Sequence, residues 1–382
     1  IGDFNLLSHG GENLRMIEFI NDGLMTIFFL LVGLEIKREL LVGELSSFRK
    51  AALPFIAACG GMLLPVLVFM SICPPGSEGG QGLAIPMATD IAFSLGVLSL
   101  LGSRVPLSLK IFLTAFAVVD DIGGILVIAI FYSSHVSYGY ILVAVLLYIL
   151  LYFIGKRGAT NKIFFLVIGV VIWYLFLQSG IHSTISGVIL AFVIPAKPRL
   201  DVGKYIEHIR HTIAGFPVME SGSIVLTNEQ IAKLKEVESA SDRVISPLQS
   251  FEDNLHGAVN YLILPLFAFV NAGVVFSGGG ELVGDVGIAV AAGLLFGKFA
   301  GIYFFTWLAI KIKLTPMPPG MTWTNLSGIA LLGGIGFTVS LFIANLSFGA
   351  NFPILLNQAK FGVLSGTILS GLLGYIVLWI VL

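Results

Sequence analysis

Four ionisable side chains interrupt long apolar stretches of this sequence. They are Asp90, Asp120, Asp121 and Lys298. An ionisable group in the middle of a membrane costs about 2.5–3.5 kcal/mol on insertion scales, and such groups are usually functional. Buried ion pairs that hold helices together are the alternative, but three carboxylates outnumber one lysine. The excess of acidic groups therefore indicates a site for mobile cations.

The neighbouring carboxyl groups of Asp120 and Asp121 favour the exchange of a metal cation for protons. Two adjacent carboxylates cannot both be ionised cheaply where the dielectric constant is low, so at least one should hold a proton near neutral pH. Sodium and lithium ions prefer carboxylate, hydroxyl and carbonyl oxygens. A cation and a proton would then compete for one site, and Lys298 would neutralise an aspartate when no ion is bound. Such competition, combined with alternating access, is sufficient for antiport.

Two of the apolar stretches carry residues that interrupt a helix. Pro86 lies shortly before the first of the four ionisable residues and removes a backbone donor. A glycine cluster before Thr338 permits unwinding in another stretch. Its members are Gly333, Gly334 and Gly336. Close helix packing is the alternative for the glycines, but two interrupted helices in corresponding parts of two halves point to a transporter binding site.

The composition places most of the chain in a membrane. Of its 382 residues, 57% are hydrophobic and only 11% are charged, whereas a soluble domain carries about 25% charged residues. The net charge of −1 argues against a nucleic-acid partner, and two cysteines are too few for a disulfide framework. The apolar runs are too long and unbroken for the strands of a membrane barrel, so we expect an all-α polytopic membrane protein.

Eleven apolar runs approach the roughly 20 residues that a transmembrane helix needs. We expect spans at residues 17–36, 51–71, 83–101, 107–131, 139–155, 162–178, 181–195, 258–276, 286–310, 325–347 and 360–382. All but three of the 21 Lys and Arg residues then fall on alternate loops. By the positive-inside rule these loops and the C-terminus face the cytoplasm.

Residues 1–382 are expected to form a single transmembrane domain with one sizeable polar segment, 196–257. We interpret this segment as a long, solvated cytoplasmic loop with a short amphipathic helix at 228–239. A regulatory or partner-binding role is the alternative.

Five motifs resemble those of the NhaA-type sodium/proton antiporters of bacteria. They are FFLLVGLEIKRE (28–39), ATDIAF (88–93), VDDIG (119–123), ILPLFAF (263–269) and GIGFT (334–338). The similarity runs over nearly the whole chain. It implies a multi-pass antiporter of the bacterial inner membrane rather than an enzyme, without a cofactor and with Na+, Li+ and H+ as the transported ions. The family has twelve spans, and its first helix would precede the hairpin corresponding to residues 1–10.

The resemblance also implies an arrangement of the helices. Two inverted three-helix repeats would cover about 50–132 and 286–382. Their middle helices, 83–101 and 325–347, would be unwound and would cross in the middle of the membrane. The unwound part of the second would contain Gly334, Gly336 and Thr338.

Roles for the site residues follow from the same resemblance. Asp120 and Asp121 would bind the cation and carry protons, with Lys298 paired to Asp120. Asp90 and Thr89 would lie near the crossing and support the site. Exchange would be electrogenic, with more protons than sodium ions moved, and would switch on at alkaline pH.

Four positions match the pH-responsive residues of the family. They are Glu35, Glu39, His182 and Glu252. A solvated charge cluster, or an ordinary interfacial histidine, is the alternative. A basic residue of this region is replaced near Gln249, and segment 196–257 is longer than in the best-known members, so the pH threshold is expected to differ. The N-terminal hairpin of the family contacts a second copy, which implies a homodimer embedded in membrane lipids.

Two functions of other classes also use buried carboxylates. An intramembrane aspartyl protease would use Asp90 and Asp121 as a dyad, but the Asp120–Asp121 doublet and Lys298 have no role in that chemistry. A proton-coupled carrier of an organic solute would need more hydrogen-bonding side chains. The sequence contains no phosphate-binding loop, so an ATP-driven pump is not indicated.

Overall fold

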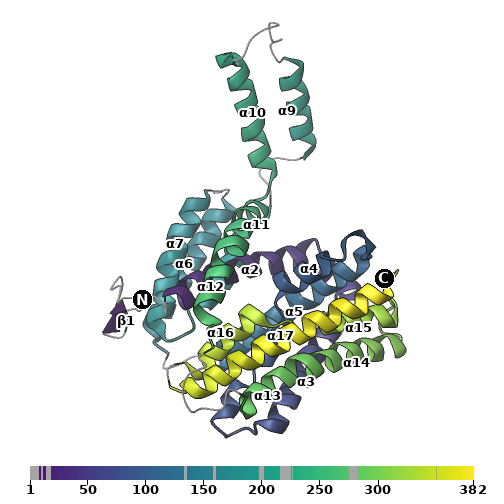
Figure 1. Cartoon of the computed structure of the whole chain (residues 1–382). Coiled ribbons are helices and arrows are strands. Elements are labelled where there is room, and N and C mark those ends of the chain that lie inside the picture. Colours follow the sequence, from purple (N-terminus) through teal and green to yellow (C-terminus); the bar gives the residue numbers. More distant parts are fainter. Residues whose placement is uncertain are drawn as a thin grey trace.

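The computed structural model is almost entirely helical. It describes residues 8–9, 12–13, 19–132, 136–157, 161–197, 202–215, 225, 227–274, 283–349 and 351–382. A short antiparallel ladder of β1 (Ser8–His9) and β2 (Glu12–Asn13) precedes the helices (Figure 1). The expectation of a helical polytopic protein is therefore confirmed.

Within the described residues, seven helices are long and apolar enough to span a membrane. They contain α2 (Met25–Leu41), α3 (Phe48–Ile72), α5 (Leu107–Phe131), α6 (Tyr138–Lys156), α7 (Lys162–Ser179), α13 (Asp285–Ala292) joined to α14 (Lys298–Lys311), and α17 (Pro353–Val381). Two bent pairs raise the number to nine. They are the short turns Gly79–Met87 with α4 (Ile91–Ser99), and α15 (Trp323–Leu332) with α16 (Phe337–Phe348).

The two remaining expected spans differ in length or position from the helices that the structure forms. Run 181–195 contains α8 (Thr184–Val193), which has only 10 residues. Run 258–276 contains α12 (Leu264–Asn271), which continues α11 (Pro247–Ala258) through the π-helical turn Val259–Ile263. The count of eleven is therefore not confirmed, because an apolar run does not fix where a helix begins and ends.

The helices pack into two groups (Figure 1). The first contains α3, α4, α5 and α13 to α17, and the second contains α2, α6, α7, α8, α11 and α12. Inside the first group α3 and α14 touch backbone to backbone, since a Cβ on Gly60 would lie 2.4 Å from the carbonyl oxygen of Gly301. The main contacts between the groups join α2 to α5 and α12 to α16. The first group comprises the two expected repeats, whose inverted symmetry remains a prediction.

Segment 196–257 contains more helix than expected. Its helices α9 (Val202–Ala214) and α10 (Asn228–Val244) form a hairpin that extends away from the two groups (Figure 1). The ring of His208 lies 3.5 Å from the carboxylate of Glu236 and links the two helices. The amphipathic helix predicted at 228–239 is confirmed as part of α10, whereas α9 was not predicted.

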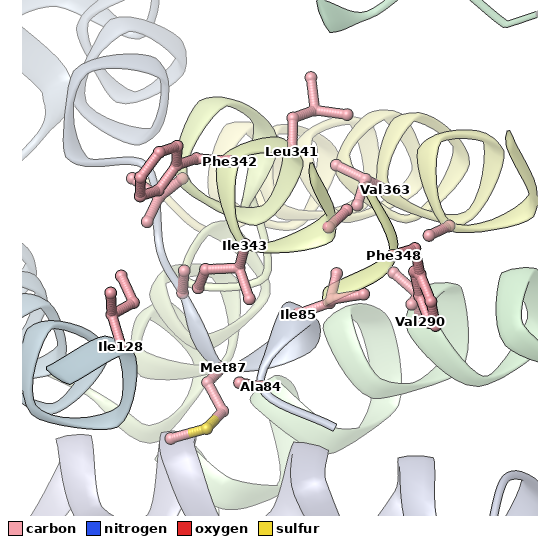
Figure 2. Close-up of a cluster of buried hydrophobic side chains, with 14 of the residues drawn as sticks. Ala84, Ile85, Met87, Ile128, Val290, Leu341, Phe342, Ile343, Phe348 and Val363 are labelled. Atoms are coloured by element: carbon pink, nitrogen blue, oxygen red, sulfur yellow. The ribbon is translucent and has the colours of Figure 1, made fainter. Parts of the chain in front are cut away.

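Helix α16 lies between the two groups and contributes to the core on two sides. Ile343 and Phe348 pack in one apolar cluster with Ile85 of the first group (Figure 2). The ring of Phe342 lies 5.7 Å from that of Phe29 in α2 and 6.3 Å, between centroids, from that of Phe267 in α12. A movement of one group relative to the other would therefore change the contacts that α16 makes with α2 and α12.

Candidate functional site

The two broken helices meet at their breaks. The halves are bent by 45° before α4 and by 44° between α15 and α16. The backbone nitrogen of Asp90 donates to the carbonyl oxygen of Ile335 at 2.6 Å, and the Thr89 hydroxyl donates to that of Gly333 at 2.8 Å. Ser94 donates to the carbonyl oxygen of Leu332 at 3.0 Å. Each break thus satisfies backbone groups of the other, as nonhelical backbone inside a membrane must.

Glycine is required where the broken segments approach their neighbours. A Cβ on Gly334 would lie 2.3 Å from the carbonyl oxygen of Leu294, and one on Gly336 would lie 3.0 Å from that of Ala88. A side chain at Gly334 would require the neighbouring backbone to shift, and one at Gly336 would require its neighbour to move by a few tenths of an ångström. The glycine cluster and Pro86 therefore explain the breaks from the sequence, and the breaks themselves are confirmed.

The carboxylate of Asp90 lies at the amino ends of two helices at once. Its Oδ1 accepts from the backbone nitrogen of Phe93 at 3.1 Å, in the first turn of α4. Its Oδ2 accepts from the backbone nitrogen of Thr338 at 3.1 Å and from the Thr338 hydroxyl at 2.5 Å, in the first turn of α16. An anion is stabilised there because unpaired N–H groups and the helix dipole present partial positive charge. Both oxygens of Asp90 therefore hold the first turns of the two broken helices.

Lys298 and Asp120 form a fully buried ion pair. The ammonium nitrogen lies 2.5 Å from Oδ2 of Asp120 and donates to the Thr89 hydroxyl at 2.9 Å. Both charged side chains are 0% exposed. Oδ1 of Asp120 has no hydrogen-bond partner among the described residues. One buried carboxylate oxygen of the pair is therefore available to a further ligand.

Asp121 differs from its neighbour because it faces a cavity. The cavity has a volume of about 1050 Å³ and is lined in its interior by Thr89, Asp90 and Asp121. Toward its mouth it is lined by Glu35, Arg38, Glu252 and further residues of α11. Asp121 itself is 7% exposed. The cavity therefore links Asp121 to the exposed and partly exposed residues of α2 and α11.

An ion pair closes part of the cavity mouth. Nε of Arg38 lies 3.4 Å from Oε1 of Glu252, which joins α2 to α11, and Arg38 also lies 3.4 Å from the carboxylate of Glu39. Burial raises the pKa of Glu252, and the Arg38 guanidinium opposes that rise. Arg38 was not predicted as part of the site. The spacing in the sequence could have indicated it, because Arg38 lies one helical turn after Glu35 on the same face of α2.

The structure separates His182 from the other expected pH-responsive residues. His182 lies between α7 and α8, with its Nδ1 4.0 Å from Oδ1 of Asp22 and its ring against Phe342. Glu35 and Glu252 line the mouth of the cavity instead. The four positions therefore do not form one cluster, and their roles in the pH response remain predictions.

Comparison with known proteins identifies the family. The family model described as Na+/H+ antiporter 1 matches residues 4–378. A protein named Na(+)/H(+) antiporter NhaA from Bacteroides thetaiotaomicron is 95% identical over 382 residues, which cover 100% of this chain and 87% of the relative. Proteins of the same name from Bacteroides fragilis and Koribacter versatilis are 81% and 45% identical, over 100% and 95% of this chain and 87% and 78% of theirs. The chain belongs to the Na+/H+ antiporter 1 family.

Proposed function

We propose that this antiporter exchanges Na+ or Li+ for protons by letting the two compete at Asp121. The observation that carries the proposal is the position of this aspartate, on the wall of the cavity and next to the buried Asp120–Lys298 pair. A carboxylate in this position can be neutralised by a proton or by a metal ion, but not by both.

The Asp120–Lys298 pair supplies the second part of the mechanism. A cation bound at Asp121 would attract the unpartnered oxygen of Asp120 and weaken its bond to Lys298. Because an ammonium that loses its buried counter-ion is strongly destabilised, Lys298 would release its proton. One cation would then replace more than one proton, which would make the exchange electrogenic.

Asp90 would keep the crossing assembled while the ion changes. Its carboxylate holds the amino ends of α4 and α16 together and compensates their dipoles without contacting Lys298. The hydroxyls of Thr89 and Thr338 hold Lys298 and Asp90 in place from the two breaks.

The cavity mouth is proposed to face the cytoplasm of a bacterial inner membrane. Arg38 at the mouth and the other basic loops support this orientation by the positive-inside rule. The C-terminus would lie on the same side. In acid, Glu252 would be protonated and would lose its charge attraction to Arg38. As the pH rises, Glu252 would ionise, and the Arg38–Glu252 ion pair between α2 and α11 would form. This change offers a physical route to activation at alkaline pH. A homodimer remains a prediction.

Inside-out membrane vesicles with a pH-sensitive dye test the proposal. Addition of NaCl or LiCl, but not KCl, should release protons from the vesicle lumen, and Asp121→Asn should abolish the response. Asp285→Asn, which changes an exposed aspartate in the first turn of α13, should leave it intact. Undiminished Na+-driven proton movement in the Asp121→Asn protein would contradict the assignment.

A further inference from the structure

Three asparagine side chains form a hydrogen-bonded chain across the two helix groups. Nδ2 of Asn345 donates to Oδ1 of Asn271 at 3.0 Å, and Nδ2 of Asn271 donates to Oδ1 of Asn21 at 2.8 Å. Asn21, in the π-helical turn Phe19–Leu24 before α2, and Asn271, at the end of α12, both belong to the second group. Asn345 belongs to α16 of the first group. The Asn345–Asn271 bond therefore crosses between the groups, whereas the Asn271–Asn21 bond does not.

This chain of amides lies at the end of the molecule opposite the cavity mouth. Asn21 precedes Glu35 on the continuous helix Phe19–Leu41 by a distance of about 21 Å at 1.5 Å per residue. At the same end, the Tyr132 hydroxyl, which follows α5, lies 2.8 Å from the hydroxyl of Ser347 on α16. Tyr132 lies about 16 Å along the helix beyond Asp121. The asparagines are thus separated from the mouth by the site itself.

Both N–H groups of Asn271 and of Asn345 are paired, and Asn271 is fully buried. Asn271 is 0% exposed, and its second N–H donates to the carbonyl oxygen of Phe267 at 3.0 Å. The second N–H of Asn345 donates to the carbonyl oxygen of Leu341 at 2.9 Å. If α12 and α16 separated, the buried amide oxygen of Asn271 would lose its partner unless water entered.

Buried apolar side chains pack between Asp121 and this end of the molecule. The gap one turn beyond Asp121 leaves no room for a water molecule and has an apolar lining apart from Thr184. Its lining includes Phe29 and Ile128, and the ring of Phe29 packs on that of Phe342, one turn before Asn345 on α16. An ion that moved from Asp121 to the far side would therefore meet the packed aromatic rings first and the chain of amides next.

We propose that the Asn345–Asn271 hydrogen bond is a latch that keeps this far route closed while the cavity is open, and that each transport cycle breaks and remakes it. The inference rests on the proposed exchange at Asp121. Alternating access requires the far route to open when the mouth closes, and α16 carries both Asn345 and Thr338, whose backbone binds Asp90. Movement at the latch is therefore transmitted along one helix to the ion site.

Covalent bridging of the latch tests the proposal. In a protein with Cys59→Ala and Cys73→Ala, the pair Asn271→Cys and Asn345→Cys is joined by a short bifunctional thiosulfonate, and Na+-driven proton movement is measured in vesicles. Bridging should abolish exchange, and a reducing agent should restore it. The matched control is the same double-cysteine protein treated with a monofunctional thiosulfonate, which modifies both thiols without joining them and should retain exchange. Exchange that persists in the bridged latch, or equal loss in the control, would overturn the proposal.

A second measurement does not depend on transport. Ile128→Cys, which places a thiol in a position that is 1% exposed, is treated with a membrane-impermeant thiol reagent from the far side. Adding Asn345→Ala should accelerate the labelling several-fold, and an unchanged rate would count against the latch. Failure of exchange in the unmodified protein would instead contradict the proposed function, so the two failures are distinguishable.

Discussion

Removal of Lys298 gives the sharpest test of the buried charge arrangement. In Lys298→Met the Asp120 carboxylate stays at 0% exposure without its counter-ion. Removing one partner of a buried ion pair typically costs about 4 kcal/mol of stability. The variant can avoid the unpaired buried charge by protonating Asp120. Protonation of an ordinary aspartate at pH 7 costs about 4 kcal/mol, which is an independent figure for the loss of stability. The two agree, so we expect the variant to fold with Asp120 protonated.

The same reasoning predicts a pH dependence with a definite sign. The folded variant would bind one proton more than its unfolded form near neutral pH, so its stability should increase by about 1.4 kcal/mol for each unit of pH lowered from 7 toward 5. The double variant Lys298→Met with Asp120→Asn has no buried charge. It should regain most of the lost stability and should show little dependence of stability on pH. Thermal unfolding in detergent, followed by tryptophan fluorescence at several pH values, measures both.

A matched control removes a lysine from the same helix. Lys311 is exposed, and its ammonium lies 4.3 Å from the ring centroid of Trp307. Lys311→Met should cost no more than about 1 kcal/mol, the size of an exposed cation–π contact. If Lys298→Met were as stable as this control at neutral pH, or showed no pH slope, the buried-pair reasoning would be refuted.

Two further predictions concern the crossing and the mouth. Gly334→Ala places a Cβ 2.3 Å from the carbonyl oxygen of Leu294 and should lower stability by about 1–3 kcal/mol in thermal unfolding, whereas Gly96→Ala, with open space around it, should not. Glu252→Gln mimics the acid form of a residue whose pKa burial raises. It should shift activation of dye-monitored exchange to more alkaline pH. Glu44→Gln, at a surface ion pair, is the control, and identical profiles for both would exclude Glu252 from regulation.

Local sequence features predicted the chemistry-bearing elements because their causes are local. Pro86 removes a backbone donor and the glycine cluster permits unwinding, and both breaks are confirmed, although Pro54 and Pro65 lie inside the unbroken α3. The apolar composition likewise predicted the helical membrane architecture. The spans at 181–195 and 258–276 were less predictable. Gly180 adopts φ 81° and ends α7, which leaves room only for the short α8. Hydropathy does not report such backbone geometry.

The amphipathic helix at 228–239 followed from its side-chain pattern, but α9 was missed within a segment that was interpreted as a loop. The signal was present, because the apolar residues of α9 recur with helical spacing at least as clearly as those of α10. The Arg38–Glu252 pair was also missed, because its partners are far apart in the sequence and join only when α11 packs on α2.

The sequence by itself determined that acidic groups would lie inside the membrane and that two helices would be interrupted beside them, because burial and backbone breaks depend on nearby residues. Tertiary structure alone decided how the adjacent aspartates differ. On one helix, Asp120 turns to Lys298 while Asp121 turns to the cavity. It also joined Asn271 to Asn345 and moved His182 away from the mouth. These relations depend on how distant helices pack, and no local pattern encodes the position of a partner that is 74 or 178 residues away along the chain.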